Sequence, residues 1–158
     1  MKRSLFVMAL LSLLLFVVAG LTGCGSRSAQ DTKGDPMNYH DLVAKLKASG
    51  AKVKPGGDIN QPFMNVQGRT LAVNGEQLQV YEYANVADAK QQAARISPDG
   101  TAFTTVSSSG LPVGATQVDW VKPPHLYKAG RIIVIYIGTN NTVMHLLAGI
   151  LGKQFAGM

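Results

Sequence analysis

The residue with the most distinctive chemistry is Cys24, which is the only cysteine among the 158 residues of the chain. A chain with one cysteine cannot form an internal disulfide, so the sulfur is free for other reactions, including thioether formation. Cys24 comes near the end of an uncharged, mostly apolar run that begins after Lys2 and Arg3. A basic start followed by an apolar stretch is typical of a secretory signal peptide. The pattern therefore predicts export and a modified cysteine at the end of the leader.

The residues Leu21-Thr22-Gly23-Cys24 resemble the lipobox of bacterial lipoproteins. The resemblance implies a diacylglyceryl group on the Cys24 sulfur, cleavage between Gly23 and Cys24, and acylation of the new amino terminus. An ordinary signal peptidase is disfavoured because it needs a small side chain where Leu21 stands. A retained transmembrane helix is the alternative, since the uncharged run is long enough to span a bilayer. We favour the lipobox. It predicts a lipid anchor in the cell membrane on the extracytoplasmic face, or in the outer membrane of a host that has two membranes.

The other reactive side chains form no recognisable constellation. His40, His125 and His145 are scattered and have no carboxylate set beside them, so solvated or hydrogen-bonded histidines are favoured over a metal site. Ser107-Ser108-Ser109-Gly110 lacks the glycine pattern of a nucleophile elbow. Gly138-Thr139-Asn140-Asn141-Thr142 could hold an anion, but the lysine of a phosphate loop is missing, so helix capping is favoured. We predict no catalytic residue, no metal and no cofactor.

The charge of the chain is mildly basic, at +6 with a pI near 9.6. Such a charge favours anionic surroundings such as phospholipid head groups or wall polymers. It lacks the dense basic stripe of nucleic-acid-binding proteins, so we predict no nucleic-acid partner. Four lysines between Lys45 and Lys54 could face anionic lipid, although a solvated face is favoured.

Three segments follow from this composition: a signal peptide over 1–23, a lipidated terminus and flexible tether over 24–36, and a globular domain over 37–158. A helix is expected from Tyr39 to a stop at Gly50. The dipeptide Asn74-Gly75 favours a type I′ hairpin that sets Leu71 opposite Leu78. The remaining expected elements are a short strand or irregular segment at 63–66, a helix from Asn85 to Ile96, strands at 103–106, 116–121 and 131–137, and a helix at 143–151.

This order of elements predicts a single α+β domain. We expect an antiparallel sheet of about four to six strands, with helices packed mainly on one face and with 131–137 at the sheet centre. Segments 70–96 and 116–151 both follow the order strand, strand, helix, which raises the hypothesis of a ββα duplication, although the two segments do not align well.

Three further patterns resemble small bacterial lipoproteins that are generally labelled hypothetical. These are Trp120–Gly138, Gly56–Phe63 and the Asn74-Gly75 hairpin. The resemblance spans most of residues 40–156 and implies no activity.

The segment that begins at the lone tryptophan is the predicted partner-binding site. It comprises Trp120, Pro123, Pro124, His125 and Tyr127. Prolines stiffen a loop, and aromatic side chains recur at binding hot spots. For Trp120 itself we favour a place in the core, in alternation with Val118. The predicted function is a membrane-anchored, non-catalytic binding module with an envelope protein or anionic polymer as partner. The alternatives are a structural or assembly factor of the envelope and a small hydrolase.

Overall fold

The computed structural model describes residues 36–158. The predicted signal peptide, Cys24 and nearly all of the tether lie outside the described residues. The described helices are α2 (Tyr39–Ala48), α3 (Val86–Ala93) and α4 (Asn141–Leu151). The strands are β1 (Val53–Ile59), β2 (Gly68–Val73), β3 (Glu76–Glu82), β4 (Ala102–Val106), β5 (Pro112–Gln117), β6 (Pro124–Ala129), β7 (Ile132–Ile137) and β8 (Ala156–Gly157). Within 36–158, no helix has the length and apolar character needed to cross a membrane.

The main sheet has six strands in the order β1-β2-β3-β7-β6-β8, and every neighbouring pair is antiparallel. Strands β4 and β5 form a separate two-stranded ribbon. The predicted α+β class and antiparallel sheet are confirmed. β7 lies between β3 and β6 and is buried along almost its whole length, which confirms the central position expected from its uniformly apolar sequence.

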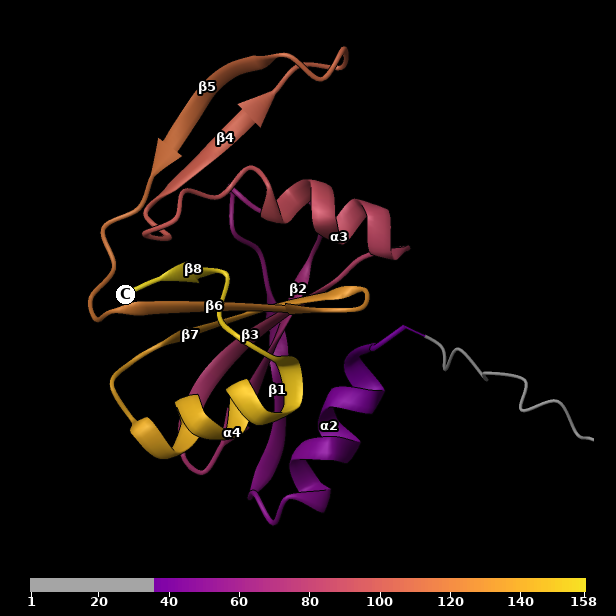
Figure 1. The fold of residues 1–158 in the computed structure, drawn as a ribbon, viewed down its shortest axis with the longest axis vertical. Helices are drawn as coiled ribbons and strands as arrows, with labels where there is room; N and C mark the ends of the chain where they lie inside the picture. The colour runs from indigo at the N-terminus through magenta and orange to yellow at the C-terminus, as the bar shows by residue number, and fades with distance from the viewer. Residues whose placement is uncertain (1–35) are drawn as a thin grey trace, which may run out of the picture. The chain divides into compact units, whose positions relative to one another are not determined.

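Each face of the sheet has its own core, because alternate residues of a strand point to opposite faces. From β7, Ile132, Val134 and Tyr136 pack beneath α2 and α4, whereas Ile133 and Ile135 pack against α3. Figure 1 shows α3 and the ribbon on one side of the sheet and α2 and α4 on the other. The expectation that helices pack mainly on one face therefore needs correction, since α3 covers the opposite face.

The hypothesis of a ββα duplication is also wrong in three dimensions. The sequence order β2-β3-α3 and β6-β7-α4 is present, and β3 pairs antiparallel with β7 at the centre of the sheet. A two-fold axis that relates such strands runs perpendicular to the sheet and would leave both helices on the same face. Helices α3 and α4 lie on opposite faces, so no such symmetry relates the two halves.

Where the local sequence signals were strong, the structure contains the elements that they favour. Asn74 and Gly75 have φ of 53° and 91°, and Leu71 pairs with Leu78, as the hairpin prediction required. The side chain of Asn85 accepts a hydrogen bond from the Asp88 N–H at 2.9 Å and begins α3. Helix α2 begins with a capping box of Asn38 and Asp41.

Other elements differ from the predictions. The edge strand β1 was not predicted, and it contains Pro55-Gly56-Gly57, which a bulge accommodates. β5 ends at Gln117, before Trp120, whereas the strand was expected to reach residue 121. Residues 63–66 form an irregular segment, which was one of the two predicted alternatives. Strands β6 and β8 were not predicted. β6 begins at Pro124, where a strand tolerates proline, and β8 is too short to leave a periodic pattern.

Candidate interaction site

The structure divides the five predicted binding residues between the core and the surface. Pro124, His125 and Tyr127 belong to β6 and are buried. His125 is 7% exposed and Tyr127 is 3% exposed. The prediction of one exposed loop is corrected for these three residues, because pairing with β7 turns the segment into an inner strand of the sheet. Trp120 and Pro123 remain partly exposed.

His125 has a structural environment rather than a reactive one. Its Nε2 lies 3.0 Å from the carbonyl oxygen of Gly138, and its Nδ1 lies 2.9 Å from Oε1 of Gln154. Its ring stacks on Tyr136 at 5.9 Å between centroids. The ring therefore links β6 to the strand end at Gly138 and to the segment that precedes β8. This agrees with the interpretation of His125 as a hydrogen-bonded histidine.

Trp120, Pro123 and Pro124 line a groove of about 560 Å³ that we call the Trp120 groove. Its walls come from Thr101 and Gln117 at the base of the ribbon, from the segment 118–124 and from Met158. Two apolar side chains at the groove are strongly exposed: Val121 at 93% and Met158 at 67%. Exposed apolar side chains beside a concave surface are a feature of protein interaction sites.

Trp120 forms one wall of this groove and is also a structural anchor. Its Nε1 donates a hydrogen bond to the carbonyl oxygen of Gly100 at 2.8 Å. Its ring lies edge-on to Phe63 and Phe103, with centroids 5.9 Å and 6.4 Å away. The sequence allowed either a core or a surface position for Trp120. In the structure one side of the indole packs on the core and the rest contributes to the surface. The position of the indole is fixed before any partner arrives, which lowers the entropy cost of binding.

The groove carries one acidic and one basic side chain, Asp119 and Lys122. No histidine or serine lines it, and Asp119 is the one carboxylate side chain of the lining. The chemistry that it offers is contact with an apolar segment, flanked by hydrogen bonds or ion pairs at the rim.

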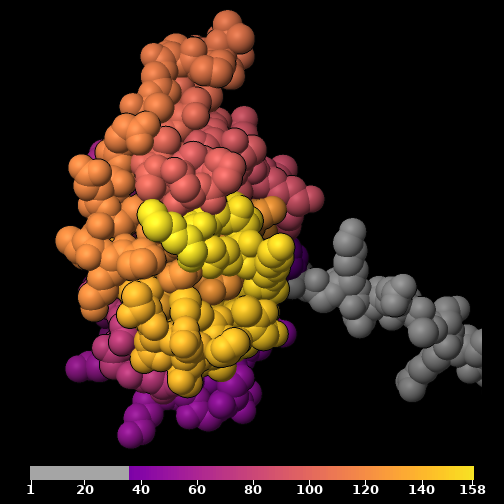
Figure 2. Space-filling view, turned by 60° about the vertical axis from the view of Figure 1, so that its left-hand side comes forward, coloured from indigo at the N-terminus to yellow at the C-terminus, as the bar shows by residue number. Residues whose placement is uncertain are grey.

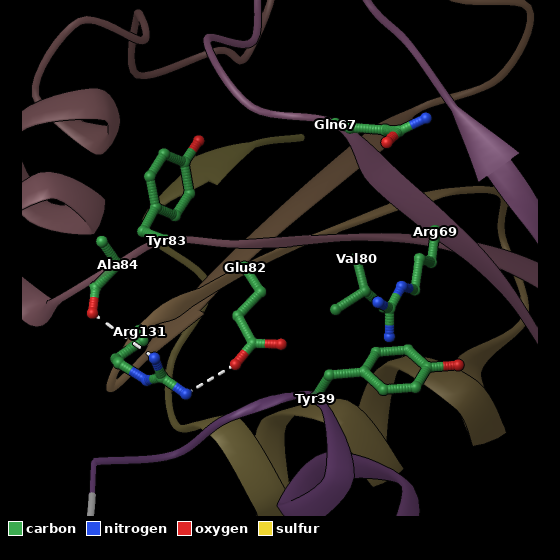
Figure 3. A pocket seen from close by; sticks show the side chains of 8 residues that line it. All are labelled: Tyr39, Gln67, Arg69, Val80, Glu82, Tyr83, Ala84 and Arg131. Atoms are coloured by element: carbon green, nitrogen blue, oxygen red, sulfur yellow. Dashed lines mark hydrogen bonds and ion pairs between the residues drawn. The ribbon is translucent and has the colours of Figure 1, made fainter.

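A second pocket, of about 280 Å³, lies between the amino-terminal end of α2 and the strands β2 and β3 (Figure 3). Its charged groups already have partners within the protein. Arg131 Nη2 contacts Glu82 Oε1 at 2.7 Å, and the Arg69 guanidinium lies 5.2 Å from the centre of the Tyr39 ring. An incoming anion would have to compete with Glu82 for Arg131. We therefore regard this pocket as the weaker candidate.

The remaining candidates from the sequence lie apart from both pockets. His40 and His145 are exposed, and residues 36–158 contain no cluster of side chains suited to a metal ion. The Asn140 side chain accepts hydrogen bonds from the N–H groups of Thr142 and Val143, so capping of α4 accounts for the 138–142 segment. The serine-rich segment forms the tip of the ribbon.

Protein families, curated proteins and solved structures gave no match.

Sequence reasoning missed Val121, Met158 and the base of the ribbon. Val121 was assigned to a strand, whose end lies earlier in the structure. Met158 reaches the groove because β8 pairs with β6, and its N–H donates to the carbonyl oxygen of Pro124 at 3.0 Å. No local pattern in the sequence predicts that a strand of only two residues pairs with β6.

Proposed function

We propose that this protein is a lipid-anchored lipoprotein of the cell envelope and that its domain is a non-catalytic interaction module. The lipobox-like residues Leu21–Cys24 support the anchor. The observation that carries the interaction role is the Trp120 groove, where a fixed indole lies beside the exposed side chains of Val121 and Met158. The proposed partner is an envelope protein that inserts an apolar segment into this groove.

Lipid anchoring is tested with the variant Cys24→Ser. A serine hydroxyl cannot form the thioether, so the variant should incorporate no fatty-acid analogue and should leave the membrane in a carbonate wash. The unsubstituted protein should resist that wash, because two or more acyl chains give stable anchoring. Continued labelling of the serine variant would contradict the anchor.

The groove is tested by photo-crosslinking in cells. A photoreactive amino acid replaces Val121 in the full chain, and the control places it at Ala87, an exposed position on α3. We expect an adduct of defined mass from position 121 and none from position 87. The additional substitution Met158→Asp should weaken the adduct. Equal yields at both positions would contradict a specific site at the groove.

A second function, as an assembly factor of the envelope, is favoured by one specific observation. The β4–β5 ribbon presents an uncharged strand edge to solvent, and an open edge of this kind can join chains together.

A further inference from the structure

The ribbon formed by β4 and β5 differs in chemistry from the rest of the domain. From Gly100 to Val118 the sequence contains no charged residue, whereas the chain as a whole carries 15 basic and 9 acidic residues. Strand β5 is exposed along nearly its full length, with Val113 at 64%, and Leu111 just before it is 66% exposed. Figure 2 shows the outer part of the ribbon projecting beyond the body of the domain.

One edge of the ribbon is covered and the other is open. On β4, the Thr104 N–H donates to the carbonyl oxygen of Arg95 at 2.7 Å, and the Ala102 carbonyl oxygen accepts from Ser97 at 2.9 Å. These bonds occupy the outer edge of β4. On β5, no strand of residues 36–158 pairs with the outer edge.

The hydrogen bonds between β4 and β5 show which backbone groups of β5 point outward. Val118 donates to the carbonyl oxygen of Thr101 at 2.8 Å, so its N–H faces β4. Inward and outward groups alternate along an antiparallel strand, which places the N–H and C=O of Ala115 and Gln117 on the open edge. Ala115 and Gln117 are also exposed at the surface.

Unlike the β5 edge of the ribbon, both edges of the main sheet are protected. Strand β1 carries Lys54, Pro55 and a bulge, and β8 has only two residues. Charges, prolines, bulges and short strands are the devices that prevent edge-to-edge pairing. Strand β5 has a proline and an irregularity only near the tip, so Gly114–Gln117 keeps a regular and neutral edge.

We propose that β5 is a self-association edge, which pairs antiparallel with β5 of a second copy about a two-fold axis near Ala115. Across such an axis each residue faces its own copy or a residue of the same strand, so any charge on the edge would meet a like charge. Two copies of a basic domain repel each other, and a neutral projecting edge allows contact while the charged bodies stay apart. This edge is centred on Ala115 and shares Gln117 with the Trp120 groove, so the proposal does not require a partner in that groove; it supplies a contact for the assembly role named above as the second function.

The first test measures copurification of two differently tagged copies of the full chain after detergent solubilisation. We expect Ala115→Lys to reduce copurification at least about tenfold, because like charges directly opposite destabilise a strand pair. Thr105→Lys is the control, since it adds the same charge to an exposed position on β4. Coexpression of Ala115→Lys with Ala115→Glu should restore the complex, which distinguishes a second copy from a different partner.

The second test does not depend on the exact register. Ala115→Pro removes an outward N–H and leaves the bonds to β4 in place, so it should abolish association while Trp120 fluorescence still reports a folded ribbon base.

A third test uses a disulfide. Ala115→Cys should give a disulfide-linked dimer under mild oxidation, mapped by mass spectrometry to position 115 in both copies. Ala87→Cys should not give this product, and the unsubstituted chain shows any linkage through Cys24. Absence of copurification in the unsubstituted protein, or equal loss with Thr105→Lys, would overturn the proposal.

Discussion

At the scale of single residues, Trp120 and His125 show how distant partners decide the role of a side chain. The Trp120 indole is bound by Gly100, and the His125 ring by Gly138 and Gln154. A histidine held by two hydrogen bonds in a buried strand stabilises the fold. A tryptophan at the boundary between core and groove can contribute to both stability and binding.

Trp120→Ala should lower the free energy of unfolding by about 2–4 kcal/mol, because it removes aromatic packing on Phe63 and Phe103 together with the bond to Gly100. Trp120→Phe keeps most of the packing and should cost only about 1 kcal/mol. Urea unfolding followed by circular dichroism measures both values. A neutral Trp120→Ala variant would show that the indole has no structural role.

At the scale of elements, close backbone approach explains positions that the sequence pattern does not. A Cβ at Gly68 in β2 would lie 2.6 Å from the ring of Tyr81, which is fully buried. By contrast, a Cβ at Gly149 in α4 would meet no atom within 4 Å. The same substitution should therefore have opposite effects in the strand and in the helix.

Gly68→Ala should destabilise the domain by about 1–3 kcal/mol, because the Tyr81 ring has no free space to move into. Gly149→Ala should stabilise it by about 0.5–1 kcal/mol, since alanine favours the helix. Thermal unfolding of the two variants beside the unsubstituted protein measures both shifts. Equal shifts would contradict the close contact at Gly68.

At the scale of the whole molecule, the domain boundary and the two cores determine stability. Met37 belongs to the fold, because its carbonyl oxygen accepts a hydrogen bond from the Arg131 N–H at 2.9 Å. Tyr39, 7% exposed, packs in the core that α2 and α4 share. These contacts attach residues 37 and 39 to the rest of the domain.

A chain that begins at Met37 should unfold cooperatively, with the same midpoint as a chain that begins at Cys24. A chain that begins at Asp41 lacks the Asn38 cap and the Tyr39 side chain and should lose about 3–5 kcal/mol. Urea midpoints of the two chains give the comparison. Equal midpoints would place the start of the domain after residue 41.

The buried tyrosines predict how stability depends on pH. Burial raises the pKa of Tyr81, Tyr83, Tyr127 and Tyr136 above the ordinary value of 10.0. Above pH about 10 the unfolded chain releases these protons while the folded chain retains them, so stability is full below that pH and falls as the pH rises. Tyrosinate absorbance of these residues should appear together with the loss of circular dichroism. Their ionisation in the folded state near pH 10 would contradict the burial.

The sequence by itself determined the elements that local chemistry specifies. The apolar spacing of α2, the cap at Asn85, the Asn74-Gly75 turn and the apolar run of β7 require only neighbouring residues. They predicted helices, a hairpin and an inner strand within an α+β fold. The tertiary structure decided what depends on distant pairing. Strand β6 became buried because it pairs with β7 and β8, which removed His125 and Tyr127 from the predicted site and brought Met158 to the Trp120 groove. The face covered by α3 was also undetermined, because β7 is apolar on both sides and offers either face to a helix.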